Sequence, residues 1–180
     1  MDIISGIKTR RSIRAFKDIP VSADVIANIV DTAAFAPSWK NSQTTRYTAI
    51  LDKSIKDKLA SDCMLGFEYN TGTANGAPAM IVISTVNGRS GYERDGSFTT
   101  DKGTHWQSFD AGIATQTLCL AAHDAGLGTV IMGIFDANKV AELISLPSGQ
   151  SVSALVAIGY PAETPDAPKR KTSADLLTIK

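Results

Sequence analysis

The chain has 180 residues, of which 43% are hydrophobic and 20% charged, and its 18 basic and 18 acidic side chains give a formal net charge of zero. This length fits one domain with a substantial core, and the neutral balance argues against a general nucleic-acid or membrane surface. No apolar run approaches the roughly 18 residues that cross a bilayer, and the early Asp2 does not fit a secretory signal. Two unpatterned cysteines and two histidines without ligand spacing predict a cytoplasmic protein with reduced thiols and no metal site.

Basic residues gather in two short blocks, one near each end. Residues 8–17 hold five and residues 169–171 hold three, which is eight of the 18 lysines and arginines. Guanidinium groups match phosphate oxygens two at a time, and chain ends often meet in compact domains. A solvated basic turn would explain the first block alone. Two blocks that can meet around one anion favour a phosphate site.

The predicted elements alternate between helices and strands. Periodicity and turn residues predict, in chain order, a helix over 2–9, a helix that begins at an N-cap Ser22 and is stopped by Pro37, a strand over 46–51, a helix over 54–60, a strand over 79–85, a long exposed loop over 87–104, a long helix over 105–125, a strand over 128–135, a helix over 137–144 and a strand over 153–161. At least four strands covered by helices indicate an α+β layered fold. The chain after Pro161 has little to pack on itself.

The chemistry-bearing motifs of hydrolases and nucleotide-binding enzymes are absent. The sequence has no GxSxG, HExxH or GxxxxGK[ST], and no GxGxxG that follows a strand. Such a chain, if an enzyme, borrows its chemistry from an organic cofactor, and a phosphate on that cofactor would explain the arginines. The polar segment APSWKNSQ and the turn in IMGIF are two further places where a ligand could bind, although an ordinary connector and a strand end explain each one singly.

Taken together, these segments resemble the FMN-dependent nitroreductase family. RRSIRAF, APSWKNSQ, FDAGIATQTLCLAAHDAGLGT, MGIF and VAIGYPAE with the later KRK follow in the family's order over residues 3–172. The resemblance implies an α+β fold with a central, mostly antiparallel sheet flanked by helices, in an intertwined homodimer. It also implies FMN as cofactor, NADH or NADPH as electron donor, and ping-pong transfer to a nitroaromatic, quinone or similar small-molecule acceptor.

The resemblance also assigns residues. It implies that the chemistry takes place on FMN, so no catalytic side chain is assigned. FMN would be held by Arg10, Arg11, Ser12, Arg14, Ser38, Asn41, Gln43, Asn70, Met132, Gly133, Ile134, Arg170 and Lys171. Ser38 would reach across the dimer, and a backbone N–H in the 132–134 turn would face the flavin ring. Trp39 and Lys40 would line the acceptor pocket, with subunit packing as the alternative for Trp39.

Two departures from the family pattern lie near these residues. After Gln43 the chain has Thr44-Thr45-Arg46, where the family commonly has proline and an aromatic residue. After the Arg-Lys pair of the tail it has Thr172, where the family often has proline. We expect one domain over 1–180, with a tail over 161–180 that docks on the partner subunit. Alternatives are another flavin enzyme on the same scaffold, of dehalogenase or flavin-fragmenting type, a non-enzymatic flavin carrier, and, least favoured, an anion-binding module for nucleic acid.

Overall fold

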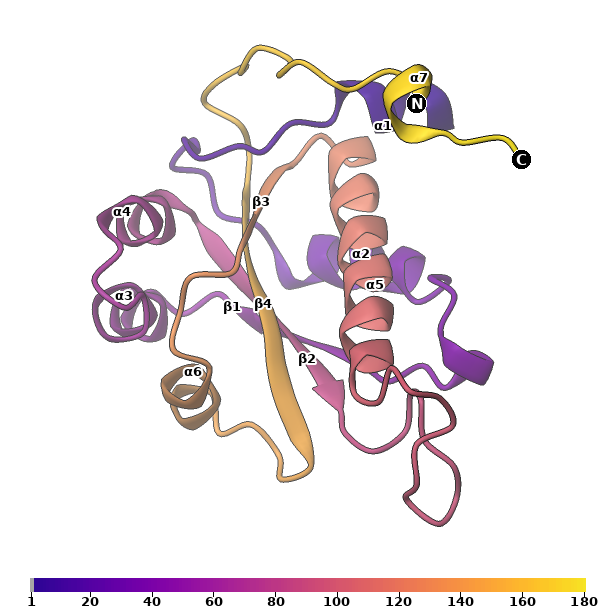
Figure 1. The fold of residues 1–180 in the computed structure, drawn as a ribbon. Helices are drawn as coiled ribbons and strands as arrows, with labels where there is room; N and C mark the ends of the chain where they lie inside the picture. The colour runs from indigo at the N-terminus through magenta and orange to yellow at the C-terminus, as the bar shows by residue number, and fades with distance from the viewer. Residues whose placement is uncertain (1) are drawn as a thin grey trace.

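A four-stranded antiparallel sheet forms the centre of the protein (Figure 1). The computed structural model describes residues 2–180. In the order in which they lie in the sheet, the strands are β1 (Thr45–Ile50), β2 (Ala79–Val86), β4 (Gln150–Gly159) and β3 (Gly128–Met132). All neighbouring strands pair antiparallel, which confirms the predicted sheet.

Helices cover both faces of this sheet (Figure 1). Successive side chains of β2 alternate between the faces. Ile81 and Ile83 pack with α2 (Ala23–Ala33) and α5 (His105–Asp124). Met80 and Val82 pack on the opposite face with α3 (Lys53–Asp62), α4 (Glu68–Gly76) and α6 (Ala137–Leu143). Because β2 is buried on both faces, its sequence AMIVISTV is a continuous apolar run.

Most of the predicted helices form where local signals place them. The Ser22 hydroxyl accepts a hydrogen bond from the Val25 N–H at 3.3 Å, which confirms it as the N-cap of α2. The Asp2 carboxylate caps α1 (Ile3–Thr9) in the same way through the Ser5 N–H. The helix α2 ends at Ala33, so it stops before Pro37 and not at it.

Three sequence predictions need correction. Residues 68–76 form α4, which the sequence did not predict, and β3 ends at Met132 although a strand to residue 135 was expected. The loop over 87–104 is only partly exposed, because Ser90 and Gly91 are buried and Tyr92 forms a β-bridge with Phe98. Packing of this loop against α5 explains the difference, since that contact is invisible in local sequence.

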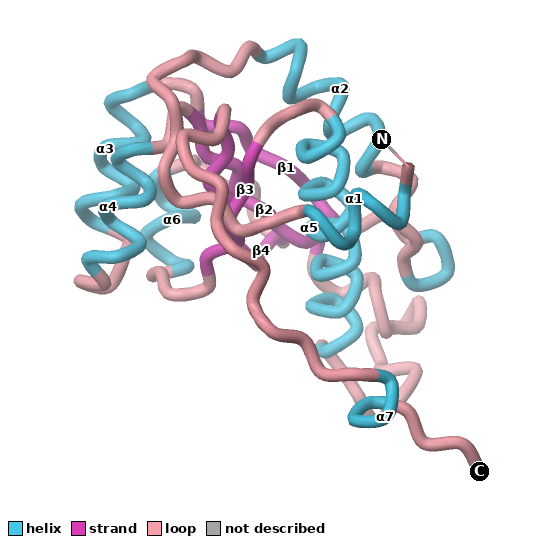
Figure 2. The backbone as a smooth tube through the Cα atoms, turned by 90° about the horizontal axis from the view of Figure 1, so that it is seen from above, coloured by secondary structure: helices cyan, strands magenta, loops and turns pink. Residues whose placement is uncertain are grey.

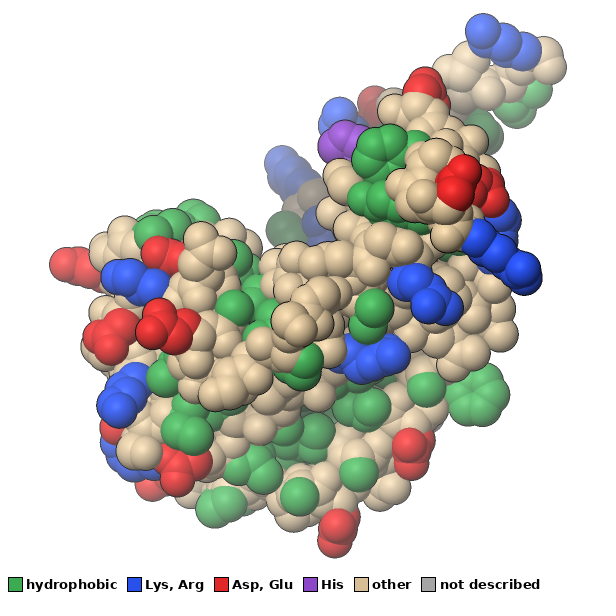
Figure 3. All heavy atoms as spheres, turned by 90° about the horizontal axis from the view of Figure 1, so that it is seen from below, with side chains coloured by type: hydrophobic (Ala, Val, Ile, Leu, Met, Phe, Trp, Pro, Cys, Tyr) green, Lys and Arg blue, Asp and Glu red, His purple; other side chains and the backbone are tan. Residues whose placement is uncertain are grey.

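The two chain ends behave differently. The segment after α1 lies beside β3, where Ser12 forms a parallel bridge to Thr129. The tail leaves β4, passes over the molecule and ends in the short helix α7 (Ser173–Leu176), which stands off from the body (Figures 2 and 3). Leu176 and Leu177 are 71% and 62% exposed, so this end of the chain has apolar surface left uncovered. Over residues 2–180, no helix combines the length and the apolar character that crossing a membrane requires.

Candidate functional site

Residues 9–16, here called the arginine segment, run along the outer edge of the sheet beside β3. The Ile13 N–H donates to the Thr129 carbonyl at 3.0 Å, and the Ile13 side chain is buried against Gly128. A Cβ at position 128 would lie 2.6 Å from Ile13 Cγ1, so glycine is required for this close approach. Since side chains alternate in an extended segment, burial of Ile13 turns the neighbouring Ser12 and Arg14 to the other side.

The three guanidinium groups have different surroundings. Arg11 Nη1 donates to the carbonyls of Lys8 and Arg10 at 2.8 and 2.9 Å, so part of this group closes the end of α1. The Arg14 guanidinium lies 5.5 Å from the centre of the Tyr69 ring. Among residues 2–180, the Arg10 side chain makes no hydrogen bond or ion pair, and its charge contributes, after burial, to the lowered pKa of His123.

A carboxylate holds the backbone of this segment. Glu163 Oε1 accepts the N–H groups of Arg14 and Ala15 at 2.6 and 3.0 Å. These two bonds keep the pKa of Glu163 below its usual range. The start of the tail is therefore fixed to the arginine segment, and the Ala162 N–H adds a bond to the Ala15 carbonyl at 2.9 Å.

A turn after β3 lies next to α4. The Asn70 side chain is 8% exposed, and its Nδ2 donates to the Ile134 carbonyl at 3.1 Å. The neighbouring Gly133 faces open space, because a Cβ there would meet nothing within 4 Å. Met132 is buried under the turn. Tyr69, whose ring lies under the Arg14 guanidinium, precedes Asn70 in α4, so Arg14 and the 132–134 turn both contact the first turn of this helix.

The second polar segment, 38–43, is a tight turn after α2. Ser38 Oγ accepts the Gln43 N–H at 2.9 Å, and the Trp39 N–H donates to the buried Asp110 carboxylate at 2.9 Å. Lys40, Asn41 and Gln43 all have φ between +46° and +53°. Such conformations cost free energy in non-glycine residues and gather at functional sites.

The same segment contains buried polar groups without partners. Trp39 Nε1, Ser42 Oγ and Thr44 Oγ1 are buried and make no hydrogen bond to any of residues 2–180. Native proteins contain few such groups, and each one calls for an explanation. Strain and unpaired polar atoms together mark residues 38–44 as a segment whose structure is not chosen for stability alone.

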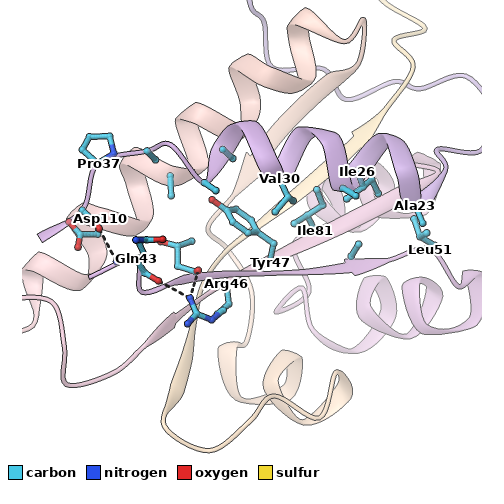
Figure 4. Close-up of a pocket in the computed structure, with 18 residues that line it drawn as sticks. Ala23, Ile26, Val30, Pro37, Gln43, Arg46, Tyr47, Leu51, Ile81 and Asp110 are labelled. Atoms are coloured by element: carbon cyan, nitrogen blue, oxygen red, sulfur yellow. Dashed lines mark hydrogen bonds between the residues drawn. The ribbon is translucent and has the colours of Figure 1, made fainter. Parts of the chain in front are cut away.

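Arg46 belongs to the Thr44-Thr45-Arg46 stretch, in which this chain departs from the family pattern. Its Nη1 donates to the carbonyls of Gln43 and Thr45 at 2.7 and 2.9 Å, so the guanidinium supports the turn (Figure 4). These residues form the polar end of a groove of about 520 Å³ between α2 and β1. The rest of the groove is apolar and includes Ile26, Val30 and Ile81.

The two groups of predicted ligand residues lie far apart in one chain. Segment 38–43 contacts Asp110, whereas the arginine segment reaches α5 at His123, where Thr9 Oγ1 and His123 Nε2 are 3.0 Å apart. Thirteen residues of helix separate these positions, which is about 20 Å at 1.5 Å per residue. Figures 1 and 2 agree that α4, with Asn70, lies across the sheet from the segment that follows α2.

The tail residues Arg170 and Lys171 are exposed on the extended stretch before α7. Within residues 2–180 neither side chain forms a hydrogen bond or ion pair, with the arginine segment or elsewhere. Their meeting with Arg10 and Arg14 around one anion stays a prediction. Sequence reasoning missed Asp110, Glu163 and Arg46, whose partners are distant in sequence or are backbone groups.

Known proteins share the fold of this chain and part of its sequence. A solved nitroreductase family protein from Streptococcus pneumoniae superimposes with a TM-score of 0.86 over 99% of this chain and 100% of its own, at 20% identity, so the likeness concerns the fold. A relative from Methanothermobacter thermautotrophicus, provisionally named NADH dehydrogenase/NAD(P)H nitroreductase, is 30% identical over 169 residues, 92% of this chain and 80% of its own. An iodotyrosine deiodinase from Haliscomenobacter hydrossis is 28% identical and covers 94% of this chain and 85% of its own.

The fold and the similarity to these relatives thus define a protein of the nitroreductase class. Residues 7–160 match the Nitroreductase family. The chain belongs to that family, as its sequence segments predicted.

Proposed function

We propose that this protein is an NAD(P)H-dependent oxidoreductase that works with bound FMN. The observation that carries the proposal is the meeting of Arg14, Asn70 and the open Gly133 turn at one edge of the sheet. A relative from Bacillus subtilis that is 29% identical, and covers 90% of this chain and 67% of its own, is named FMN reductase [NAD(P)H]. Two free, buried cysteines fit the further proposal of a cytoplasmic protein.

The residues at this edge fit a flavin mononucleotide. Arg10 has a guanidinium group without a protein partner among residues 2–180, and the Arg14 guanidinium bonds only weakly to the Ser12 carbonyl, at 3.4 Å. Both can bind a phosphate. The bare Gly133 turn allows a flat ring to approach the backbone, and Asn70 holds that turn in place. The free edge of the Arg11 guanidinium and the Ser12 hydroxyl would complete the contacts along the ribityl chain.

We propose further that a second copy completes the site. Ser38, Asn41 and Gln43 lie at the Asp110 end of α5, about 20 Å along this helix from the His123 end that Thr9 contacts, so we propose that they serve the partner's flavin. In a two-fold dimer each copy would offer its 38–43 segment to the other's turn. Strain and unpaired polar groups in that segment fit a surface built for contact. The apolar tail around Leu176 would dock on the partner, in the groove beside the edge strand β1.

When bound, FMN would supply the chemistry, by accepting a hydride from NADH or NADPH and passing electrons to a second substrate. The protein's part is binding and electrostatics. Backbone N–H groups at 133–134 would face the ring, and their dipoles would favour its reduced, anionic form. Trp39 and Lys40 would line the space for a nitroaromatic, quinone or similar acceptor. Reductive dehalogenation is the second candidate reaction, because one relative is named iodotyrosine deiodinase.

The cofactor proposal is tested with the purified chain and added FMN. We expect the protein to bind FMN and to oxidise NADH or NADPH when a nitroaromatic or quinone is present. Iodotyrosine in a parallel assay, with iodide release as the readout, separates the dehalogenase candidate. Tight FMN binding without NAD(P)H oxidation, whichever acceptor is added, would favour the alternative of a non-enzymatic flavin carrier. Absence of FMN binding would overturn the proposal.

The two-chain site has its own test. Two variants, Arg10→Gln with Arg14→Gln and Ser38→Ala with Asn41→Ala, are co-expressed with different tags and the mixed dimer is purified. In a shared site the mixed dimer carries one intact site and one doubly damaged site, so it regains about half of the wild-type activity. If each site came from one chain, both sites of the mixed dimer would stay damaged.

A further inference from the structure

Residues 88–94, which no assignment above uses, form one side of a second cavity. This cavity has a volume of about 600 Å³ and is lined by Lys40 together with Gly88, Arg89, Tyr92, Glu93 and Arg94. Lys40 lies between Ser38 and Gln43, two of the residues proposed to approach the partner's flavin. The cavity therefore opens beside the place where an acceptor would stack on the ring.

The charges around this cavity are mostly positive. Glu93 is the single acidic lining residue, and its carboxylate is paired with Lys40 Nζ at 3.6 Å. Neither Arg89 nor Arg94 has a side-chain hydrogen bond or ion pair within residues 2–180. Two unpaired guanidinium groups thus face a cavity whose one carboxylate is neutralised.

The wall that carries these arginines is firmly built. Ser90 is fully buried and its hydroxyl donates to Asp110 Oδ2 at 2.5 Å, the same oxygen that accepts the Trp39 N–H. The Gly88 N–H donates to Gln107 Oε1 at 2.7 Å. A Cβ at Gly91 would lie 2.9 Å from the Trp106 ring, so this wall packs directly on α5. Through Asp110, segments 37–43 and 88–94 are held as one unit.

We propose that this cavity is an anion subsite, in which Lys40, Arg89 and Arg94 bind the carboxylate of an acceptor or the 2′-phosphate of NADPH. The inference rests on the proposed oxidoreductase function. Asp110 and Ser90 act as positioning residues, since they touch no substrate and fix the wall relative to Lys40. Aromatic acceptors would stack beside Tyr92 while their anionic group meets the arginines.

Binding is measured first without turnover. The chain has two tryptophans, Trp39 and Trp106, whose ring centres lie 4.7 Å apart next to this cavity. Their fluorescence therefore reports whether the cavity is occupied. We expect 4-nitrobenzoate to quench it at lower concentration than the neutral 4-nitrobenzamide. In Arg89→Gln and Arg94→Gln the benzoate affinity should fall about fivefold each, and the preference should weaken with added salt. Lys102→Gln removes the same charge from the loop outside the cavity and should change neither affinity.

Turnover then separates the two sources of the anion. A higher KM for 4-nitrobenzoate in the arginine variants, with 4-nitrobenzamide unchanged, assigns the subsite to acceptors. A higher KM for NADPH with NADH unchanged assigns it to the donor. Ser90→Ala should raise the same KM without changing FMN affinity. Ser97→Ala should leave that KM unchanged, because within residues 2–180 the Ser97 hydroxyl bonds to Asp95 alone.

Equal affinity of the wild type for benzoate and benzamide in the fluorescence titration would overturn the subsite. That result does not depend on FMN, so it is distinguishable from failure of the proposed function, which would appear as a protein that binds benzoate but not FMN.

Discussion

The Asn70 side chain donates from Nδ2 to the Ile134 carbonyl at 3.1 Å and so joins α4 to the turn after β3. This hydrogen bond links α4, whose sequence has low intrinsic helix propensity, to the turn that we propose faces the flavin ring. Loss of the amide would leave the turn without its anchor and the carbonyl without its partner.

The first prediction concerns this link. Asn70→Ala should weaken FMN binding about tenfold, in line with the loss of one well-placed hydrogen bond. Flavin fluorescence quenching during titration with the protein measures the change. Asn75→Ala, at an exposed site on the same helix, is the control. Equal FMN affinity of Asn70→Ala and wild type would contradict a role for the 132–134 turn.

The arginine segment makes a prediction about the phosphate. Arg10→Gln and Arg14→Gln should each weaken FMN binding by about ten- to a hundredfold, since charge-assisted bonds to phosphate are lost. Riboflavin, which lacks the phosphate, should bind wild type and variants alike. The two titrations are run side by side. A parallel loss for riboflavin would mean that the arginines shape the site and do not bind phosphate.

Lys56 provides a prediction about stability. Its buried ammonium group donates to the carbonyls of Ala74 and Asn75 at 3.1 and 3.0 Å and so closes the end of α4. Lys56→Met leaves these carbonyls without that donor and should lower the free energy of unfolding by about 1–3 kcal/mol. Urea denaturation measures it. Lys53→Met removes only an exposed pair with Asp57 and should leave the midpoint nearly unchanged.

Glu163 gives a prediction with a pH dependence. Its pKa in the folded protein lies below the ordinary 4.5, because the Arg14 and Ala15 N–H groups bond to the carboxylate. The stabilisation is therefore present above about pH 4.5 and is lost as pH falls through the lower, folded-state pKa. Wild type should be more stable than Glu163→Gln at pH 6, and this advantage should shrink steadily as the pH falls below 4.5. Urea denaturation at several pH values measures the difference in stability between wild type and Glu163→Gln. A difference that does not change with pH would rule out the Glu163 charge as its cause.

Local signals were enough to predict most elements of this fold. The Ser22 cap and the apolar run of β2 each act within a few residues, and both predictions are confirmed. The helix α4 was missed because Gly72, Gly76 and several threonines and asparagines give it low intrinsic helix propensity. Packing on α3 and the Lys56 ammonium stabilise it, and neither is visible in residues 68–76 themselves.

For the candidate site the limit was distance along the chain. The motifs RRSIR and APSWKNSQ indicated ligand residues, but nothing in them shows that α5 keeps the two segments about 20 Å apart. The sequence also did not identify Asp110 as a site residue, because its partners Trp39 and Ser90 lie 71 and 20 residues away along the chain. The polarity of residues 87–104 predicts an exposed loop, whereas the hydroxyls of Ser90 and Thr99 in this loop are buried.

The most direct test of the central claim is the visible absorption spectrum of the protein after reconstitution with FMN and removal of free flavin, recorded before and after anaerobic addition of NADH or NADPH. The account predicts flavin bands that stay with the protein and bleach with at least one donor. A colourless protein after removal of free flavin would contradict it, as would bands that persist with both donors.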